Sequence, residues 1–345
     1  MKILENVLLK ELTTMRLGGA AEYVIEVEKK EELAEACEFI RDKNLAVYFL
    51  GEGANSLGRD EGFSGAILMN KIKGIRILEE SEEGGEKYMK IEVAGGEIWD
   101  DVVKFTTGRG LTGIEAMAKI PGTAGAAPVQ NIGAYGQEIA QTLETVEAYD
   151  TLIDEIVEIP KEKMNFGYRK SIFNSGETRG RYFIISITLK LKRGEIRQPF
   201  YNSLQKYLDE NGISDYSPKS IYQAVAAIRA EKLPDPKEIA SAGSFFKNIY
   251  VDDTEAERLE KLGVPIRRGE AGRNKVNTGY LIEAAGLVGK SFFGFKVNEK
   301  ASLVLINESG KSFSDLEKAV AEIARVVKEK FGVSLEKEPV EIKEN

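Results

Sequence analysis

The sequence has no histidine, and it has only one cysteine and one tryptophan in 345 residues. The missing histidine excludes Ser-His-Asp catalytic triads, histidine-ligated metals and acid–base chemistry by imidazole. We therefore expect a site without a metal ion. Cys37 cannot form a disulfide within the chain, and its place in the helical pattern of residues 31–44 predicts a buried, unreactive side chain. This cysteine usage is typical of the cytoplasm, where we expect the protein.

Long hydrophobic runs and an excess of basic residues are also missing. No window approaches 18 consecutive apolar residues, and the first 14 residues lack a signal-peptide pattern, so we expect neither export nor a membrane anchor. The formal net charge of −8 argues against a nucleic-acid partner, which would require a clustered basic face. We expect a monomer that binds small molecules.

The length favours two or three domains, and the hydrophobic pattern suggests where they divide. A first region, residues 1–74, alternates strand-like and helix-like runs, with the helical run at 31–44 between strands at 23–27 and 46–50. A strand at 66–70 completes this small α/β unit.

The second region, residues 75–232, is richer in strands. We predict strands at 75–80, 88–94, 144–149 and 181–192, and a helix from Trp99 that Gly110 could close. A helix-like run at 221–233 ends this region.

The third region, residues 233–345, follows the breaker sequence PDPKE at 234–238. We predict helices at 254–263 and 313–332 and a strand at 302–307. The second of these helices carries one apolar stripe, formed by Leu316, Val320, Ile323, Val326 and Val327. A last strand in the sequence GVSLEKEPVEI is predicted to return toward an earlier part of the molecule.

The first glycine cluster directly follows the strand at 46–50. Its backbone N–H groups could cradle a pyrophosphate, whereas a plain tight turn is an equally weighted alternative. The spacing is G-x-G-x-x-x-x-G and the next residues are turn-like, so a Rossmann dinucleotide fold is excluded. The candidate cofactor-binding residues here are Gly51, Glu52, Gly53, Ala54, Asn55 and Ser56.

The second glycine cluster, PGTAGAAPVQNIGAYG at 121–136, is more specific. Its small side chains would let the backbone approach a flat ligand, and Gln130 and Asn131 could read ring heteroatoms. Its Val, Ile, Ala and Tyr content excludes a flexible linker. The candidate cofactor-binding residues here are Pro121, Gly122, Gly125, Ala126, Ala127, Gln130, Asn131, Ile132, Gly133 and Ala134.

Two further blocks are NFGYRKSIF at 165–173 and AGSFFKN at 242–248, the latter preceded by KLPDP. Taken alone, Arg169 could form a surface ion pair and Ser244 could cap a helix or a turn. The order of all four blocks carries more information than any one of them.

In that order the four blocks resemble the UDP-N-acetylenolpyruvoylglucosamine reductase (UDP-N-acetylmuramate dehydrogenase) family, from Thr14 to the last predicted strand. The subtype resembled has a QNIGAYG loop and a tyrosine-bearing segment. The resemblance implies an α+β fold, with a vanillyl-alcohol-oxidase-type (PCMH-type) FAD-binding fold of two subdomains and a C-terminal substrate-binding domain. It also implies tightly but non-covalently bound FAD, NADPH as hydride donor and UDP-N-acetylglucosamine-enolpyruvate as substrate.

The resemblance also assigns roles to residues. Ser244 corresponds to the general acid, and Arg169 and Glu338 to the other catalytic positions. The residues implied to bind substrate are Tyr168, Tyr201, Lys232 and Asn248.

This chain departs from the family pattern at several of these blocks. Ala54 replaces a serine in the first cluster, and Asn298 and the pair Gly294-Phe295 replace a histidine and a glycine pair. Pro339 follows Glu338, which leaves Glu336 and Glu341 as alternatives for the catalytic glutamate.

Two other functions compete with this interpretation. An FAD-linked oxidase of the same superfamily would transfer hydride to oxygen, but covalent flavin attachment in that class uses histidine or cysteine. A non-catalytic nucleotide-sugar binding protein could keep the fold. The joint presence of Arg169, Ser244 and a glutamate in the last strand argues against that alternative.

Overall fold

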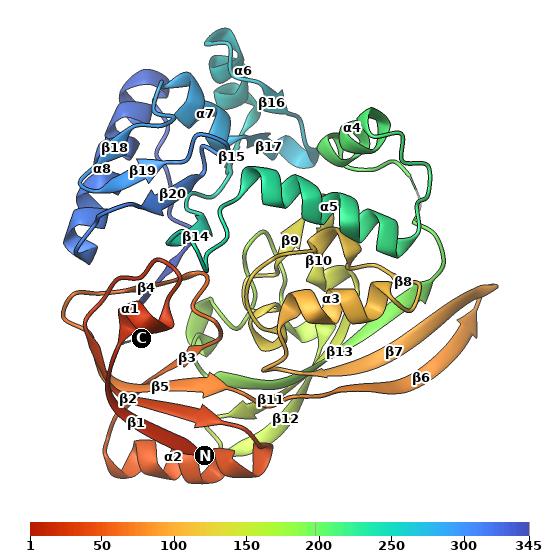
Figure 1. Cartoon of the computed structure of the whole chain (residues 1–345), viewed down its shortest axis with the longest axis vertical. Helices are drawn as coiled ribbons and strands as arrows, with labels where there is room; N and C mark the ends of the chain where they lie inside the picture. Colours follow the sequence, from red (N-terminus) through yellow and green to blue (C-terminus); the bar gives the residue numbers. More distant parts are fainter. Residues whose placement is uncertain (197, 345) are drawn as a thin grey trace.

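The computed structural model describes residues 1–196 and 198–344. The N-terminal region forms a four-stranded sheet with the strand order β1-β2-β5-β3. The strands are β1 (Lys2–Leu8), β2 (Ala20–Val27), β5 (Phe63–Asn70) and β3 (Ala46–Leu50). Helix α2 (Leu33–Asp42) packs on one face and buries Leu33, Ala36, Cys37 and Ile40 there (Figure 1). The predicted elements of this region and the burial of Cys37 are confirmed, whereas β1 and the short α1 (Leu9–Leu12) were not predicted.

A second, antiparallel sheet lies against the first in the order β12-β11-β13-β7-β6. Its strands are β6 (Ile75–Glu83), β7 (Glu86–Ala94), β11 (Leu143–Asp150), β12 (Glu155–Pro160) and β13 (Tyr182–Arg193), with β8 (Leu111–Thr112) beside β13. Phe183 and Ile185 of β13 share a core with α2, which joins the two sheets.

Helix α3 (Trp99–Thr107) covers the second sheet and ends earlier than predicted. Its C-cap residue, Gly108, keeps a right-handed conformation. The N–H of Gly110 donates to the carbonyl of Thr107 in the following turn, where Gly110 has φ +69°. Gly110 therefore closes this turn and not the helix itself.

Two helices then lead toward the C-terminal region: α4 (Asn202–Glu210), which was not predicted, and α5 (Pro218–Lys232). Ser217 caps α5 by accepting from the Ser220 N–H at 3.3 Å, and Pro218 occupies the first turn, where its missing N–H costs nothing. The buried side of α5 packs on α3, α4 and residues 115–117. Figure 1 shows α5 crossing the molecule beneath the C-terminal elements.

The C-terminal region combines two small sheets with three helices. One sheet has the strand order β14 (Ser241–Ser244), β20 (Val304–Asn307), β19 (Phe295–Val297) and β18 (Ser291–Phe292). The other sheet has the strand order β15 (Ile249–Val251), β17 (Asn274–Val276) and β16 (Ile266–Arg267). The helices are α6 (Asp253–Lys261), α7 (Thr278–Ala284) and α8 (Phe313–Phe331). The α8 stripe buries Leu316, Ile323 and Val327, and Gly332 ends this helix in a left-handed conformation.

The last strand, β21 (Val340–Ile342), pairs in parallel with β4 (Ser56–Gly58), directly after the first glycine cluster. The predicted return of the chain is therefore confirmed, and no helix follows β4, as the exclusion of a Rossmann fold requires. The second glycine cluster leads into a short hairpin whose two strands, β9 (Gly133–Ala134) and β10 (Gln137–Glu138), each have two residues. None of the helices within the described residues combines the length and apolarity needed to cross a bilayer.

Candidate active site

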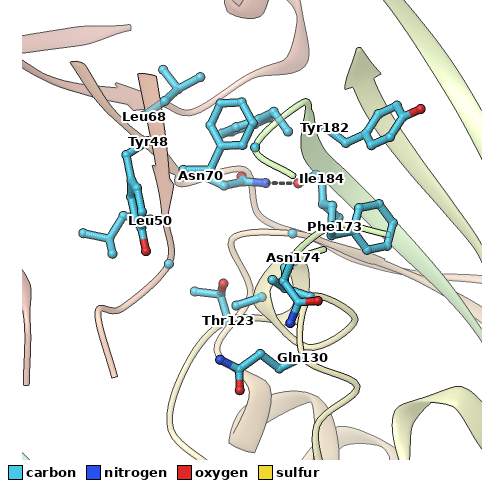
Figure 2. A pocket seen from close by; sticks show the side chains of 18 of the residues that line it. Tyr48, Leu50, Leu68, Asn70, Thr123, Gln130, Phe173, Asn174, Tyr182 and Ile184 are labelled. Carbon is cyan, nitrogen blue, oxygen red and sulfur yellow. Dashed lines mark hydrogen bonds between the residues drawn. The ribbon is translucent and has the colours of Figure 1, made fainter. Parts of the chain in front are cut away.

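An open cavity lies between the first sheet and the second. Tyr48, Leu50 and Leu68 line it from the first sheet, and Ile184 and Tyr182 line it from β13 (Figure 2). Asn70 Nδ2 donates to the Ile184 carbonyl at 2.7 Å and ties the two sheets together at the cavity wall. The predicted cofactor-binding residues that line this cavity are Gly51, Gly125, Ala126 and Gln130.

The two glycine clusters meet at one end of this cavity. The N–H of Gly122 donates to Glu52 Oε2 at 3.1 Å, so the carboxylate of Glu52 holds the clusters together. Gly53 has φ +64°, and a Cβ there would lie 2.0 Å from the Leu12 carbonyl oxygen. A Cβ on Gly51 would narrow the space between the clusters, because it would lie 3.0 Å from Thr123 Oγ1. This narrow, mostly apolar space between backbone segments fits a flat dinucleotide cofactor such as FAD.

The predicted residues of the second cluster fall into two groups. Gln130 lines the cavity, whereas the side chain of Asn131 is buried and fully occupied by the protein. Asn131 Nδ2 donates to Glu138 Oε2 at 2.9 Å and to the Gly167 carbonyl at 3.1 Å, and its Oδ1 accepts from the Ala140 N–H. Asn131 therefore shapes this loop and connects it to the arginine-bearing segment.

Arg169, near the middle of the sequence, and Glu338, near its end, are brought together by the fold. Arg169 Nε donates to Glu338 Oε1 at 2.6 Å, and Arg169 Nη2 lies 3.4 Å from the Gly133 carbonyl oxygen. Arg169 has φ +54°, a left-handed conformation that is unusual for arginine. Burial raises the pKa of the Glu338 carboxyl above its ordinary value, against the opposing effect of the Arg169 guanidinium.

The two alternative glutamates have other partners. Glu336 is exposed and pairs with Lys247, while Glu341 accepts from Arg59 at 3.1 Å and from Lys337 at 2.7 Å. Glu338 is therefore the carboxylate that the structure places against Arg169.

Ser244 ends strand β14 beside the segment that carries Glu338. The next residue, Phe245, accepts through its carbonyl from the Glu338 N–H at 2.9 Å, and its own N–H donates to Leu303. Ser244 is partly buried and pairs with Val304. These backbone contacts fix the serine and the glutamate on neighbouring segments.

The residues implied to bind substrate lie on several elements. The hydroxyl of Tyr168 accepts from the backbone N–H of Asn248 at 3.2 Å, and the Tyr168 ring lies 5.2 Å from that of Tyr250. Tyr201 precedes α4 and contacts the Tyr135 ring at 6.0 Å. Lys232 is exposed at the end of α5.

Several functional candidates escaped the sequence analysis. Arg229 of α5 is close enough to Arg169 and Tyr135 to interact with both electrostatically. Its position just before the KLPDP block was the available signal. Tyr48, Asn70 and Arg179 line the cavity and carried no motif. Within the described residues, no group of three or more acidic or cysteine side chains could hold a metal ion.

Comparisons with known proteins agree with this geometry. Residues 21–154 match the family model for an FAD binding domain, and residues 235–342 match the model for the C-terminal domain of UDP-N-acetylenolpyruvoylglucosamine reductase. The chain is 36% identical over 336 residues to the reductase of that name from Paraburkholderia phytofirmans, covering 96% of this chain and 95% of the relative. It is 33% identical to the one from Pseudomonas aeruginosa, covering 98% of each chain.

A solved structure shares the fold over nearly the whole length. The crystal structure of UDP-N-acetylenolpyruvylglucosamine reductase from Thermus caldophilus aligns with a TM-score of 0.66 at 24% identity and covers 99% of both chains. The expected α+β architecture, an FAD-binding fold followed by a C-terminal domain, is confirmed.

Proposed function

The chain belongs to the UDP-N-acetylenolpyruvoylglucosamine reductase family, and on that basis we propose that it uses NADPH and FAD to reduce UDP-N-acetylglucosamine-enolpyruvate to UDP-N-acetylmuramate. This reaction belongs to the synthesis of peptidoglycan precursors. The observation that carries the proposal is the Arg169–Glu338 pair, held at 2.6 Å beside the strand that ends in Ser244.

Bound FAD would accept hydride from NADPH and deliver it to C3 of the enolpyruvyl group. The clusters at 51–56 and 121–134 would hold it, with the pyrophosphate against the first cluster and the isoalloxazine near the second. Gly51, Gly125 and Ala126 leave the space for it because they lack large side chains. Ala54 supplies no hydroxyl to the pyrophosphate, which we expect to weaken FAD binding relative to a serine at this position.

The proton and the developing charge are then handled by the chain's own residues. As hydride reaches C3, negative charge develops on C2 and on the attached carboxylate. Arg169 and a protonated Glu338 donate hydrogen bonds to that carboxylate, and the raised pKa of Glu338 favours the protonated form. The hydroxyl of Ser244 delivers the proton to C2. A serine hydroxyl is a weak acid, so the position of Ser244 relative to C2 must make up for its low acidity.

The rest of the substrate would be bound by residues from three different segments. Tyr168 and Asn248, already joined by hydrogen bonds, would face the diphosphate and uridine side together with Lys232. Tyr201 would close over the diphosphate from the start of α4, where 42% of it is exposed.

We propose three domains, at residues 1–74, 75–232 and 233–345, and a monomer that works in the cytoplasm. In support, the C-terminal core has its own cluster of buried side chains, from Ala242 to Val333, and takes in only Met15, Leu17 and Leu57 from the first region.

The test is an anaerobic stopped-flow experiment on the purified protein, followed by flavin absorbance near 450 nm. NADPH should bleach the flavin, and UDP-N-acetylglucosamine-enolpyruvate should then restore the absorbance. Bleaching without recovery would retain a flavoprotein and reject this substrate. In a separate run without the substrate, rapid recovery when oxygen is admitted to the reduced protein would favour an FAD-linked oxidase.

A further inference from the structure

Asn174 lies between the cofactor cavity and the turn that carries Arg169. Its side chain lines the cavity between the two sheets (Figure 2). The Asn174 amide also forms two hydrogen bonds with the backbone of the arginine-bearing segment. Its Nδ2 donates to the Arg169 carbonyl at 3.0 Å, and its Oδ1 accepts from the Ser171 N–H, also at 3.0 Å. The amide therefore holds the peptide groups on both sides of Lys170.

Arg169 occupies a strained position in a tight turn. Gly167 and Lys170 close this turn with two backbone hydrogen bonds, at 2.9 and 3.2 Å, so Tyr168 and Arg169 are its central residues. Arg169, the second of them, has φ +54°, a conformation in which glycine or asparagine is usually found. The left-handed conformation costs free energy in a residue with a Cβ, so an arginine at this position needs contacts that hold its backbone.

Two asparagines anchor this turn, one on each side. Asn131 Nδ2 donates to the Gly167 carbonyl at 3.1 Å, which ties the start of the turn to the second glycine cluster. Asn174 acts from the other side, on the carbonyl of Arg169 itself. Within the described part of the chain, Asn174 is the side chain that holds the backbone of Arg169 by a hydrogen bond.

The backbone conformation of Arg169 decides where its guanidinium points. In the present conformation Arg169 Nε contacts Glu338 Oε1 at 2.6 Å. A return of φ to the usual negative region would turn the Cα–Cβ bond and carry the side chain away from Glu338. A displacement of about 1 Å is enough to break a hydrogen bond of this length. The contact that holds the Arg169 carbonyl therefore also holds the guanidinium.

We propose that Asn174 is a positioning residue for the reduction of the substrate. Its amide keeps Arg169 in the left-handed conformation that directs the guanidinium toward Glu338 and the substrate carboxylate. The inference rests on the proposed function, which gives Arg169 its catalytic role. Because the same asparagine lines the cavity that fits FAD, one side chain supports both the wall of the cofactor site and the catalytic arginine.

The experiment follows both half-reactions of the holoenzyme in anaerobic stopped-flow traces, with rates expressed per bound flavin. Asn174→Ala should slow flavin reoxidation by UDP-N-acetylglucosamine-enolpyruvate by roughly tenfold to hundredfold, the loss expected for a misplaced catalytic group, and leave flavin reduction by NADPH unchanged. The matched control, Thr178→Val, removes another bond of the same loop, from the Thr178 hydroxyl to the Ile172 carbonyl at 2.7 Å. It should leave both rates unchanged. A wild-type rate of reoxidation in Asn174→Ala overturns the proposal.

A double-mutant cycle separates positioning from a general structural role. In an Arg169→Met background, Asn174→Ala should slow reoxidation by less than about twofold, because the group that Asn174 positions is already gone. An equal loss in both backgrounds would mean that Asn174 supports the fold and not Arg169.

Asn174→Asp keeps the side-chain shape and the acceptor for the Ser171 N–H, so it should fold even where Asn174→Ala does not. It replaces the donor to the Arg169 carbonyl by a second acceptor and should also slow reoxidation. A wild-type rate in this variant contradicts the proposal.

A second measurement is independent of the proposed function. The carboxyl of Glu338 is influenced by Arg169 and Lys247, and the guanidinium opposes the effect of burial on its pKa. In Asn174→Ala the displaced guanidinium should let the pKa of Glu338 rise further, whereas Thr178→Val should leave it unchanged.

Carboxyl ¹³C NMR of glutamate-labelled protein would measure this pKa, with the Glu338 signal identified by its loss in Glu338→Gln. If the wild-type protein does not reduce the substrate but the pKa rises in Asn174→Ala, the proposed function fails and the placement of Arg169 by Asn174 stands. An unchanged pKa overturns that placement.

Discussion

At Glu338, burial and a neighbouring arginine act in opposite directions on the same carboxyl group. Burial is the larger effect and raises the pKa, so this carboxyl keeps its proton to a higher pH than an exposed glutamate does. If the neutral acid is the reactive form, the rate of flavin reoxidation by substrate should fall as pH rises through the folded-state pKa. Glu338→Gln, which cannot ionise, should be slower, by about tenfold or more, and should lose this pH dependence. Anaerobic stopped-flow traces across pH would measure both effects, and an unaltered pH profile in the variant would exclude Glu338 as the titrating group.

The same pKa shift has a consequence for stability. A carboxyl whose pKa is higher in the folded than in the unfolded state stabilises the fold below the unfolded value. That contribution is lost as pH rises through the folded-state value. Glu338→Gln should therefore gain stability relative to the wild type as pH rises, which denaturant unfolding at several pH values would measure. A constant difference at all pH values would contradict this.

Ser244→Ala tests the proton donor. Because the hydroxyl is needed only when the proton reaches C2, NADPH should still reduce the flavin at the wild-type rate. Flavin reoxidation by substrate should slow by about 10²- to 10⁴-fold, the usual contribution of a general acid. Equal losses in both half-reactions would indicate a folding or cofactor defect.

At the scale of elements, the loop at 51–56 is held by close backbone contact. Gly53 and Gly84 both have positive φ, but only Gly53 has atoms within contact distance of an added Cβ. Gly53→Ala should displace the loop, lower the bound flavin per chain and destabilise the fold by about 1–3 kcal/mol. Gly84→Ala, in an open hairpin turn, should cost only about 1 kcal/mol and leave the flavin content unchanged. The ratio of flavin absorbance to protein absorbance and the melting temperatures would test this pair.

The spacing of apolar residues predicted most helices and strands, because in each of these elements the apolar residues are the ones that the fold buries. The α8 stripe and the buried strand at 66–70 are examples. The strand β1 escaped prediction because its side chains are mostly exposed or half-buried and it relies on pairing with β2. Helix α4 is short and polar, and it buries only Leu204 and Leu208.

For the site, family motifs located Arg169, Ser244 and Glu338, but they could not show which contacts these residues make. The last strand pairs with β4, which lies far away in the sequence, and this pairing places Glu338 against Arg169. A contact between segments so far apart is not encoded in any local sequence pattern. Arg229 lies on a helix with a weakly amphipathic sequence, and the burial of its Nε without a hydrogen-bond partner in the described part of the chain became visible only in the folded protein.

At the scale of the whole molecule, the C-terminal region is attached to the first region around Arg59 and Asp60. Asp60 accepts from the backbone N–H groups of Phe313 and Ser314, at 2.6 and 3.0 Å, at the start of α8. Asp60→Ala should destabilise the protein by about 0.5–2 kcal/mol and slow substrate reduction more than flavin reduction, because Glu338 would be held less firmly. Asp60→Asn keeps one acceptor oxygen, so its stability and its rate of substrate reduction should lie between those of the wild type and those of Asp60→Ala. Equal effects on both half-reactions would mean that this contact does not support the catalytic segment.

The pairing of β21 with β4 also sets the order in which the protein can mature during translation. Asn55, in the first glycine cluster, is separated from Glu338 by 283 positions. The FAD-binding sheets can form on the nascent chain long before the ribosome has made the segment that completes the site. A partly synthesised chain would lack Glu338 and also Val340, which lines the cavity between the two sheets. Both the cavity and the catalytic pair would therefore be completed only when the last residues have left the ribosome.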